Sequence, residues 1–423
     1  MSGKLQAVRG MNDLLPEATG TWQRVEETLR RVGQVYGYRE IRTPVVEKTE
    51  LFRQSIGEQT DIVEKEMYTF ADSGGELLTL RPEGTASCVR AGVQHGLFHN
   101  RQERLWYMGP MFRRERPQKG RYRQFHQFGV EAIGWPGPDV DAEVILIGER
   151  IWRELGVEGV RLELNTLGSP VSRARYRASL IDYLAARREA LDGDSWRRLE
   201  SNPLRILDSK VEATREIVAG APDILDFLDD EARAHFDGLR ALLDKAGVDY
   251  RVNSRLVRGL DYYTSTVFEW TTDRLGAQGT VCAGGRYDGL IEQRGGRPTP
   301  AAGFATGLER LIELLVQQDA APARPPFDIY LARLGAEAEK RALVLAETLR
   351  NAGLSVIYNC GGGKLKNQLR RADASGAELA LILGEEELAG GVVQIKFLRR
   401  EQPQETVAVD QLEGWLGSVI GDR

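Results

Sequence analysis

The amino-acid sequence predicts a mixed α and β protein with more than one domain, and three observations lead to this fold class. The 423 residues suffice for two or three domains, each large enough for its own core. Helical and strand-like patterns are mixed over residues 1–168 and 251–318, whereas the segment between them is almost wholly helical. After residue 327 the order is β-α-β-α-β-β, which predicts a small α/β domain that folds alone.

The composition is that of an ordinary soluble globular protein, with 42% hydrophobic and 28% charged residues and a formal net charge of -5. Any positive charge that binds a nucleic acid must therefore be local. No run approaches the roughly 20 apolar residues of a membrane span, and the first residues have no apolar signal-peptide core. Three distant cysteines and four scattered histidines form no metal-ligand spacing, so we expect a metal-free protein of the reducing cytoplasm.

Residues 1–168 alternate between helical and strand-like spacing. Pro44 favours an edge position for its strand, because proline cannot donate a ladder hydrogen bond. Pro117 and Gly120 are the turn residues between two strands that enclose a basic loop. The elements expected here are helices over residues 19–36 and 139–155 and strands over 41–46, 105–108, 125–130 and 162–167.

A helical insertion is predicted over residues 169–250. Ser169 suits the position that caps a helix, and Pro170 suits the first residue inside it. The pattern then stays helical and highly charged to about residue 248. Both a plain scaffold and an RNA-contacting module fit that composition.

Residues 251–318 return to strands, with one expected over 267–270 and a glycine-rich stretch over 276–289. Residues 301–316 begin as a glycine-punctuated strand and continue as a helix. The run 317–326 holds three prolines and three alanines, so we place a linker at 319–326 and a separate domain at 327–423. That domain is expected to contain strands over 328–332, 355–358, 379–383 and 392–397 and helices over 336–352 and 364–375.

The basic loop between the two early strands is the most informative segment for chemistry. Six cations face one internal acid, Glu115, and a rigid pair of strands presents them. Arginine offers a planar fork of donors that matches phosphate oxygens, so we expect a polyphosphate site. The alternative is a solvated charged hairpin. The six cations are Arg113, Arg114, Arg116, Lys119, Arg121 and Arg123.

Two further constellations suit a small polar ligand. Glu83 and Thr85 offer a charge and a hydroxyl to an ammonium group, although a simple turn after a strand also fits Pro and Gly at this point. Arg258 stands close to Tyr262 and Tyr263, which suits a polar pocket. The alternative for the tyrosines is core filling, in which an alternating strand points one ring inward and one outward.

A fourth constellation joins a glycine-bearing strand to a helix. Gly303 and Gly307 would let a ligand approach the backbone closely. Arg310 follows at the start of a helix, whose N-terminal end favours anions. A phosphate-binding role is therefore expected here as well.

In this order the motifs resemble those of class II aminoacyl-tRNA synthetases. Residues 41–51, the basic hairpin and residues 307–311 are similar to the three motifs of that class. Residues 258–263 and 284–290 resemble the histidine-specific signatures of the histidyl-tRNA synthetase family. Segments 80–86, 202–210 and 363–372 also match that family.

The resemblance implies an α+β catalytic domain with an antiparallel sheet flanked by helices, formed by residues 1–168 and 251–318. It also implies a C-terminal α/β anticodon-binding domain at 327–423 and a homodimer. The implied enzyme activates L-histidine with ATP and Mg²⁺, giving histidyl-adenylate and pyrophosphate, and transfers histidine to the 3′ end of tRNA(His). The alternative is a catalytically silent regulatory subunit of histidine biosynthesis, which usually lacks the last domain and the catalytic arginines.

The resemblance also assigns roles to residues of this sequence. ATP would be held at the α-phosphate by the catalytic Arg113 and Arg258, at the γ-phosphate by Arg121 and Arg310, and at adenine by Glu115 and Phe125. Histidine would be held at its amino group by Glu83, Thr85 and Gln127 and at its imidazole by Glu131 and Tyr263, with Arg258, Tyr262 and Tyr287 beside it. The tRNA acceptor end would meet Arg116 and Gln118, and the anticodon region a basic helix with Lys364, Lys366, Arg370 and Arg371. No protein metal site is implied.

Overall fold

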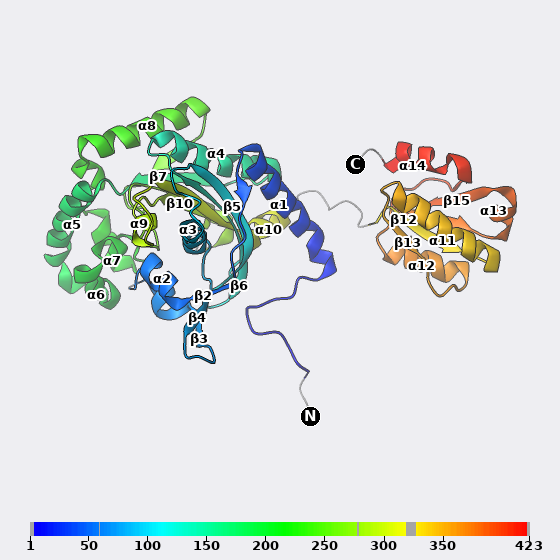
Figure 1. Ribbon diagram of the computed structural model, residues 1–423, viewed down its shortest axis with the longest axis horizontal. Coiled ribbons are helices and arrows are strands. Elements are labelled where there is room, and N and C mark those ends of the chain that lie inside the picture. Colours follow the sequence, from blue (N-terminus) through cyan, green and yellow to red (C-terminus); the bar gives the residue numbers. More distant parts are fainter. Residues whose placement is uncertain (1–3, 59, 277–278, 319–326, 421–423) are drawn as a thin grey trace. The chain divides into compact units, whose positions relative to one another are not determined.

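The computed structural model describes residues 4–58, 60–276, 279–318 and 327–420. The chain divides into two compact units, Met1–Ala320 and Ala321–Arg423, and each is described by itself (Figure 1). The expected linker at 319–326 lies outside the described residues. The finer boundaries at residues 168 and 250 stay predictions.

An eight-stranded sheet forms the centre of the first unit, in the order β1-β5-β6-β11-β10-β9-β7-β8. Its inner neighbours pair antiparallel, as expected, but β1–β5 and β7–β8 are parallel, so the sheet is mixed at its two edges. Short edge strands limit the backbone available for unwanted pairing. The strands are β1 (Arg39–Glu40), β5 (Glu103–Phe112), β6 (Gln124–Ile133), β7 (Arg161–Thr166), β8 (Tyr250–Val252), β9 (Thr266–Thr271), β10 (Thr280–Arg286) and β11 (Ala301–Gly307).

The hairpin β5–β6 confirms the strand–loop–strand prediction. Its register runs from Glu103 opposite Ile133 to Phe112 opposite Gln124, which leaves residues 113–123 as the loop. Gly120 adopts φ +68° in this loop, a conformation that glycine reaches without strain. The basic loop is therefore anchored on two ten-residue strands.

Helices cover the sheet with the apolar faces that the sequence predicts. The expected helices 19–36 and 139–155 are found as α1 (Pro16–Val35) and α4 (Pro138–Leu155), and α10 (Leu308–Gln317) follows β11. Leu29, Val144 and Leu311 are fully buried in one core with sheet residues. Burying such a side chain contributes about 1.5–3 kcal/mol. Short elements α9 (Leu290–Gln293) and η5 (Asp273–Leu275) lie between the later strands.

The prediction of one strand over residues 41–46 is wrong, because β1 ends at Glu40 and β2 begins at Val46. Pro44 has no N–H to donate, and the chain instead leaves β1 and enters β2 (Val46–Lys48) of a second, three-stranded sheet, β2-β4-β3. Just after β1, the Ile41 N–H still donates a hydrogen bond to the Trp106 carbonyl of β5. The sequence analysis missed this small sheet. Its neighbouring elements are β3 (Tyr68–Ala71), β4 (Leu77–Leu80), α2 (Thr49–Ile56), η1 (Ile62–Glu66) and α3 (Thr85–Gln94).

The segment after residue 169 is helical, as predicted, and forms the green group of helices in Figure 1. Ser169 caps its first helix by accepting a hydrogen bond from the Ser172 N–H at 3.1 Å. Tyr176, Leu180 and Ile206 are fully buried in a core that this segment shares with residues of the large sheet, such as Leu105 and Ile133. The elements are α5 (Pro170–Ala185), η2 (Arg188–Ala190), α6 (Gly193–Ser201), η3 (Pro203–Asp208), α7 (Glu212–Ala219), η4 (Ile224–Phe227) and α8 (Asp230–Ala246).

The second unit is the expected α/β domain, with a five-stranded sheet in the order β13-β12-β14-β15-β16. β12 pairs in parallel with both β13 and β14, whereas β15 pairs antiparallel with both β14 and β16. The sequence analysis missed α13, β16 and α14, which are short. The elements are β12 (Ile329–Arg333), α11 (Ala336–Asn351), β13 (Val356–Tyr358), α12 (Leu365–Ala374), β14 (Leu379–Leu383), α13 (Glu385–Gly390), β15 (Val392–Phe397), β16 (Glu405–Ala408), η6 (Val409–Gln411) and α14 (Leu412–Ile420).

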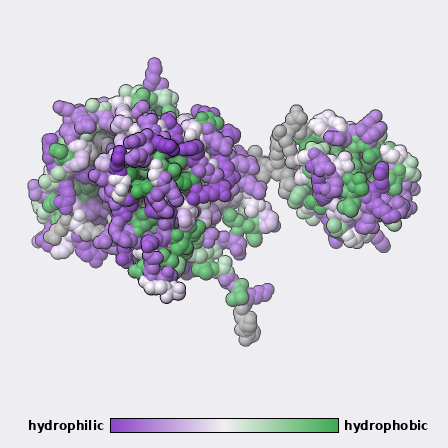
Figure 2. Space-filling view, in the orientation of Figure 1, coloured by the Kyte–Doolittle hydropathy of each residue, from purple (hydrophilic) through white to green (hydrophobic). Residues whose placement is uncertain are grey.

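The visible surface is dominated by hydrophilic side chains with scattered apolar patches (Figure 2). Within the described ranges, no helix combines the length and the apolar character needed to cross a membrane. The hydrophobic core of the first unit lies between the large sheet and its helices.

Candidate active site

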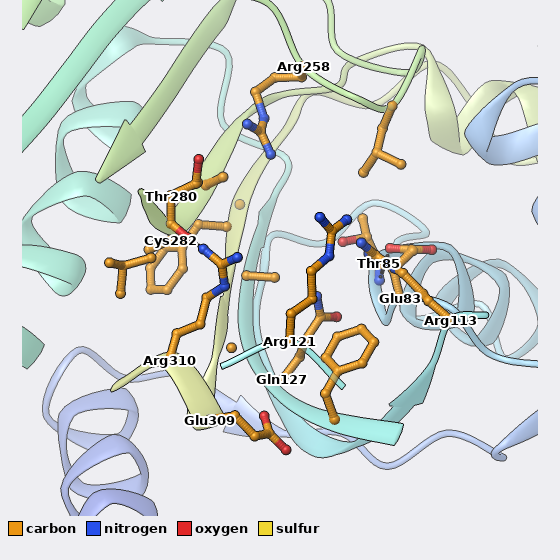
Figure 3. A pocket seen from close by; sticks show the side chains of 18 of the residues that line it. Glu83, Thr85, Arg113, Arg121, Gln127, Arg258, Thr280, Cys282, Glu309 and Arg310 are labelled. Carbon is orange, nitrogen blue, oxygen red and sulfur yellow. Dashed lines mark hydrogen bonds between the residues drawn. The ribbon is translucent and has the colours of Figure 1, made fainter. Parts of the chain in front are cut away.

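A cavity of about 250 Å³ lies over the large sheet and beneath the basic loop (Figure 3). It gathers residues from every constellation that the sequence analysis singled out in this unit. Of the residues expected to hold ATP or histidine, all but Glu131 line it. They are Glu83, Thr85, Arg113, Glu115, Arg121, Phe125, Gln127, Arg258, Tyr262, Tyr263, Tyr287 and Arg310.

Strand alternation explains how β6 serves the cavity. Residues two apart on a strand share one face, so Phe125 and Gln127 both reach the cavity and Glu131 lies further along the same face. Gly129 lies between them on that face, and a side chain there would collide with the Tyr107 ring. The side-chain oxygen of Gln127 is buried and has no hydrogen-bond partner among the described residues. Such an atom in a cavity is suited to a donor group of a ligand.

Four arginines reach the cavity from three different segments. Arg113 and Arg121 come from the basic loop, Arg310 from the first turn of α10, and Arg258 from the connection between β8 and β9. Figure 3 shows the side chains of Arg121 and Arg310 extending into the cavity with Arg258 across from them. The fold thus collects positive charge that is dispersed along the sequence.

Each of these arginines also has a protein partner. Arg121 forms an ion pair with Glu115, and Arg258 forms one with Glu269 on β9. The expected contact of Glu115 with adenine therefore competes with an existing ion pair and stays a prediction.

The other two arginines are held by the backbone. The Arg113 Nε donates to the Pro82 carbonyl at 2.9 Å, and Arg310 donates to the Thr280 carbonyl. Arg113 also lies over the ring of Phe125, 5.3 Å from its centre. The expected stacking of Phe125 on adenine stays a prediction too.

Burial and neighbouring charge both perturb cations of the cavity. Burial, with smaller contributions from the charges of Arg121 and Arg113, lowers the pKa of Arg310 to about 10, so this side chain stays charged near neutral pH. Burial also lowers the pKa of Arg113 from its usual value. A polyanion in this cavity would relieve the repulsion among these cations.

Glu83 has a structural task that the sequence analysis did not foresee. Its carboxylate accepts hydrogen bonds from the backbone N–H groups of Thr85 at 2.7 Å and Ala86 at 2.9 Å, and so caps α3. Only 3% of the residue is exposed, and burial raises its pKa against the opposing effect of those bonds. A contact with a substrate amino group stays a prediction.

Glu131 is fully buried and does not line the cavity. The Thr85 hydroxyl donates to its Oε1 at 2.7 Å, and the Tyr287 hydroxyl donates to its Oε2. Burial raises the pKa of this carboxyl group to about 8. The expected pairing of Glu131 with an imidazole nitrogen is therefore an untested prediction, and in this structure the carboxyl group is bonded to protein groups.

The tyrosines form one aromatic group. The ring centres of Tyr262 and Tyr263 are 4.7 Å apart, and those of Tyr262 and Tyr287 are 5.6 Å apart. The alternative of an alternating strand with one ring inward and one outward does not hold, because both residues lie in the irregular connection between β8 and β9. Both are 6% exposed and both line the cavity. Burial raises the pKa of Tyr263 to about 12, so its hydroxyl stays protonated.

Two site carboxylates went unassigned in the sequence analysis. Glu309 lines the cavity and accepts hydrogen bonds from the His126 backbone N–H at 2.9 Å and from its ring at 3.0 Å. Glu269 pairs with Arg258 and accepts from the Thr280 hydroxyl at 2.8 Å. Glu309 could have been found from the sequence, because it lies inside the glycine-bearing segment 302–311. No sequence pattern points to Glu269.

The residues expected to meet tRNA lie on the surface. Arg116 and Gln118 are exposed at the tip of the basic loop. In the second unit, Lys364 precedes α12, and Lys366 and Arg370 are exposed on that helix. Arg371 is exposed as well, and its Nη1 donates to Asn359 Oδ1 at 2.9 Å.

Among the described residues, no group of three or more His, Cys, Asp or Glu side chains is arranged to hold a metal ion. The cavity therefore presents arginines, a few bonded carboxylates and buried hydroxyl groups. That chemistry is suited to a phosphate-rich ligand beside a small polar one.

The mixed sheet, its arginine-bearing hairpin and the separate α/β unit define a class II aminoacyl-tRNA synthetase-like protein with an anticodon-binding domain. Residues 10–311 match the family model for histidyl-tRNA synthetase, and residues 328–418 match the model for the anticodon binding domain. The chain belongs to the histidyl-tRNA synthetase family.

Solved structures agree with this family. Apo histidyl-tRNA synthetase of S. aureus is similar with a TM-score of 0.82 and 35% identity, over 97% of this chain and 99% of that chain. Histidyl-tRNA synthetase of Nostoc sp. PCC 7120 has a TM-score of 0.73 and 22% identity, over 99% and 100% of the two chains.

A third similar structure carries a different description. It is described as an ATP phosphoribosyltransferase regulatory subunit/histidyl-tRNA synthetase from Bacillus halodurans C, with a TM-score of 0.66 and 24% identity, over 91% of this chain and 99% of that chain. At such identities, the likeness supports the fold alone.

Proposed function

We propose that this protein is a histidine–tRNA ligase, which joins L-histidine to tRNA(His) in an ATP-dependent, AMP-forming reaction. The convergence of Arg113, Arg121, Arg258 and Arg310 in one cavity beside a buried polar pocket carries this proposal. The membership in the histidyl-tRNA synthetase family supports it as well.

ATP would occupy the arginine-lined part of the cavity. Arg113 and Arg258 would contact the α-phosphate, and Arg121 and Arg310 would contact the γ-phosphate. Burial chiefly, and the charges of Arg121 and Arg113 next, lower the pKa of Arg310, and this supports the arrangement because bound phosphates would replace repulsion by attraction. Glu115 would turn to adenine once Arg121 exchanges its carboxylate partner for phosphate oxygens.

Histidine would occupy the end of the cavity formed by Thr85, Gln127 and the three tyrosines. The unpartnered oxygen of Gln127 would accept from the substrate amino group. Glu131 and Tyr263 would face the two imidazole nitrogens. A site that bonds both ends of a polar ring discriminates against analogues by about 10⁴ to 10⁵.

The first reaction needs position and charge more than a protein base. The histidine carboxylate, already ionised, attacks the α-phosphorus, a new oxygen–phosphorus bond forms, and the bond to the β-phosphate oxygen breaks as pyrophosphate leaves. Arg113 and Arg258 would stabilise the negative charge that builds on the α-phosphate oxygens. In the second step, a tRNA ribose hydroxyl attacks the acyl carbonyl and AMP leaves.

Magnesium would arrive with ATP rather than at a protein cage. We assign no protein residues to this ion, which phosphate oxygens would hold. Bound there, it would neutralise charge on the departing pyrophosphate.

The second unit would bind the anticodon region of tRNA(His), with Lys364, Lys366 and Arg370 exposed toward phosphates. Arg116 and Gln118 on the basic loop would meet the acceptor end. The family also supports a homodimer, which sedimentation of the purified protein would test.

Charging of tRNA tests the proposal. Purified protein with ATP and Mg²⁺ should attach histidine to tRNA(His) and leave a tRNA of another specificity uncharged. A protein that serves only as a regulatory subunit of histidine biosynthesis, as the name of one similar structure suggests for that protein, would charge no tRNA.

A further inference from the structure

A short segment before α1 lies against the basic loop. Residues 8–12, here named the N-terminal strap, make a tight turn in which the Met11 N–H donates to the Val8 carbonyl at 2.8 Å. Gly10 occupies the third position of this turn at φ +85°, a conformation that favours glycine. Residues 4–9 are exposed, whereas Gly10 is buried, so Gly10 is the point at which the strap packs most closely.

That point is the base of the basic loop. The Gly10 carbonyl accepts hydrogen bonds from the backbone N–H groups of Arg123 at 2.7 Å and Gln124 at 3.2 Å. The Arg9 carbonyl accepts from Arg123 Nη1 at 3.3 Å. The strap therefore binds the loop through its backbone, where Arg123 returns the chain to β6.

The Arg123 side chain connects the strap to the opposite side of the basic loop. Its Nε donates to the Glu115 carbonyl at 3.1 Å, so one guanidinium joins the strap to the opposite side of the loop. Packing adds to the bonds, since a side-chain carbon at Gly10 would stand 2.8 Å from Pro117 Cγ and 3.0 Å from Arg123 Cγ. Only a glycine fits between the strap and the loop tip.

The loop so held carries Arg113, Glu115 and Arg121, which line the cavity. A flexible loop loses conformational entropy when a bound ligand orders it. If the strap already orders the basic loop before the ligand binds, part of that entropy loss no longer opposes binding. We propose that the N-terminal strap positions the basic loop for ATP, with Gly10 and Arg123 as positioning residues. This inference rests on the proposed function, because it assigns ATP to the cavity.

The first test substitutes Gly10→Ala and uses Gly37→Ala as a matched control. Gly37 also has a positive φ, +77°, and a side-chain carbon there would meet no atom within 4 Å. Both variants carry backbone strain, but only Gly10→Ala disturbs the loop. If one loop in ten remains in the binding-competent conformation, the apparent KM for ATP rises about 10-fold. The KM for histidine should stay within about twofold, since its residues lie on other segments.

A second full-length variant, Arg123→Lys, covers the case in which Gly10→Ala does not fold. Lysine keeps the positive charge but has no planar fork to join the carbonyls of Arg9 and Glu115. It should raise the KM for ATP in the same direction, with an unchanged KM for histidine. Equal ATP constants for Arg123→Lys and the natural protein, or for Gly10→Ala and Gly37→Ala, would overturn the role of the strap.

The two proposals fail in different ways. If the natural protein shows no histidine-dependent pyrophosphate exchange, the proposed function is wrong whatever the variants do. Calorimetric binding of ATP to the same proteins then still tests the strap, because it requires no chemistry. A protein that binds no ATP at all would end both proposals.

Discussion

At the scale of single residues, the arginines of the cavity are held in place by carboxylates and by backbone carbonyls. Arg258 pairs with Glu269, which also accepts the Thr280 hydroxyl, so the guanidinium is oriented before any substrate arrives. Preorganised charge of this kind lowers a barrier without reorganisation at the moment of reaction. The role of Arg258 should therefore appear in the transition state.

Arg258→His should lower kcat for pyrophosphate exchange by about 10² to 10³, which corresponds to a loss of about 2.7 to 4 kcal/mol. KM for ATP and histidine should change far less, since ground-state binding is shared by several arginines. Arg114→His is a suitable control, because Arg114 is an exposed cation of the basic loop outside the cavity lining. An unchanged kcat, with only a lower melting temperature, would make Arg258 a structural cation.

Glu131 makes a prediction about pH. The pKa of its carboxyl group rises from 4.5 to about 8 because of burial, so the folded state binds its proton more tightly than the unfolded state. This contribution to stability is present below about pH 4.5 and is lost as the pH rises through about 8. Glu131→Gln removes the titration and should flatten that part of the pH dependence of the melting temperature. Parallel curves for the two proteins would show that the carboxyl group titrates normally.

The sequence could predict which residue types gather in the cavity but not how they pair. Alternation on β6 places Phe125 and Gln127 in the cavity and Glu131 further along the same face, outside the cavity lining. The partners of Arg121 and Arg258 depend on the path of irregular connections, which periodicity does not encode. The same limit explains Tyr262 and Tyr263, whose connection lacks the alternation expected of a strand.

At the scale of elements, Gly303 and Gly307 lie on one face of β11 but differ in the space that a side chain would meet. A side chain at Gly303 would collide with the Glu131 carboxylate and the Val130 carbonyl, so the space is filled by protein. Gly307 has only Arg310 Cδ at 3.9 Å, and its face opens to the cavity. The expected ligand approach is thus reasonable for Gly307, while packing explains Gly303.

Gly303→Ala should destabilise the fold by at least the 1–3 kcal/mol typical of an overpacked core, because backbone and a buried carboxyl group cannot easily move. Gly307→Ala should change stability by less than about 0.5 kcal/mol. Urea unfolding of both variants gives the comparison. Equal losses of stability would mean that the crowding around Gly303 relaxes at little cost.

Elements with a strong period were predictable, and those decided by tertiary pairing were not. The helices α1 and α4 and the strands β5 and β6 follow from spacing alone. The strand expected over residues 41–46 failed because Pro44 ends one pairing and the next belongs to a different sheet. Likewise, the parallel edge strands β1 and β8 are too short to leave a pattern.

At the scale of the whole molecule, the arginine-lined cavity and the basic helix α12 belong to different compact units. Each unit has its own buried core, so each is expected to fold without the other. A chain that ends at Gln318 should therefore keep pyrophosphate exchange but lose most of its charging of tRNA(His). If it charges tRNA as well as the full chain, the second unit does not bind the anticodon region.

The central claim is that the cavity activates histidine with ATP, and amino-acid-dependent exchange of pyrophosphate into ATP measures that step directly. The full-length protein should be assayed with each of the twenty amino acids in turn, at equal concentrations and with Mg²⁺ present. The account predicts exchange with histidine alone, because Gln127 and Tyr263 line the cavity and, with Glu131 behind Thr85 and Tyr287, are proposed to bind the amino group and the imidazole ring. Robust exchange with another amino acid, or none with histidine, would contradict it.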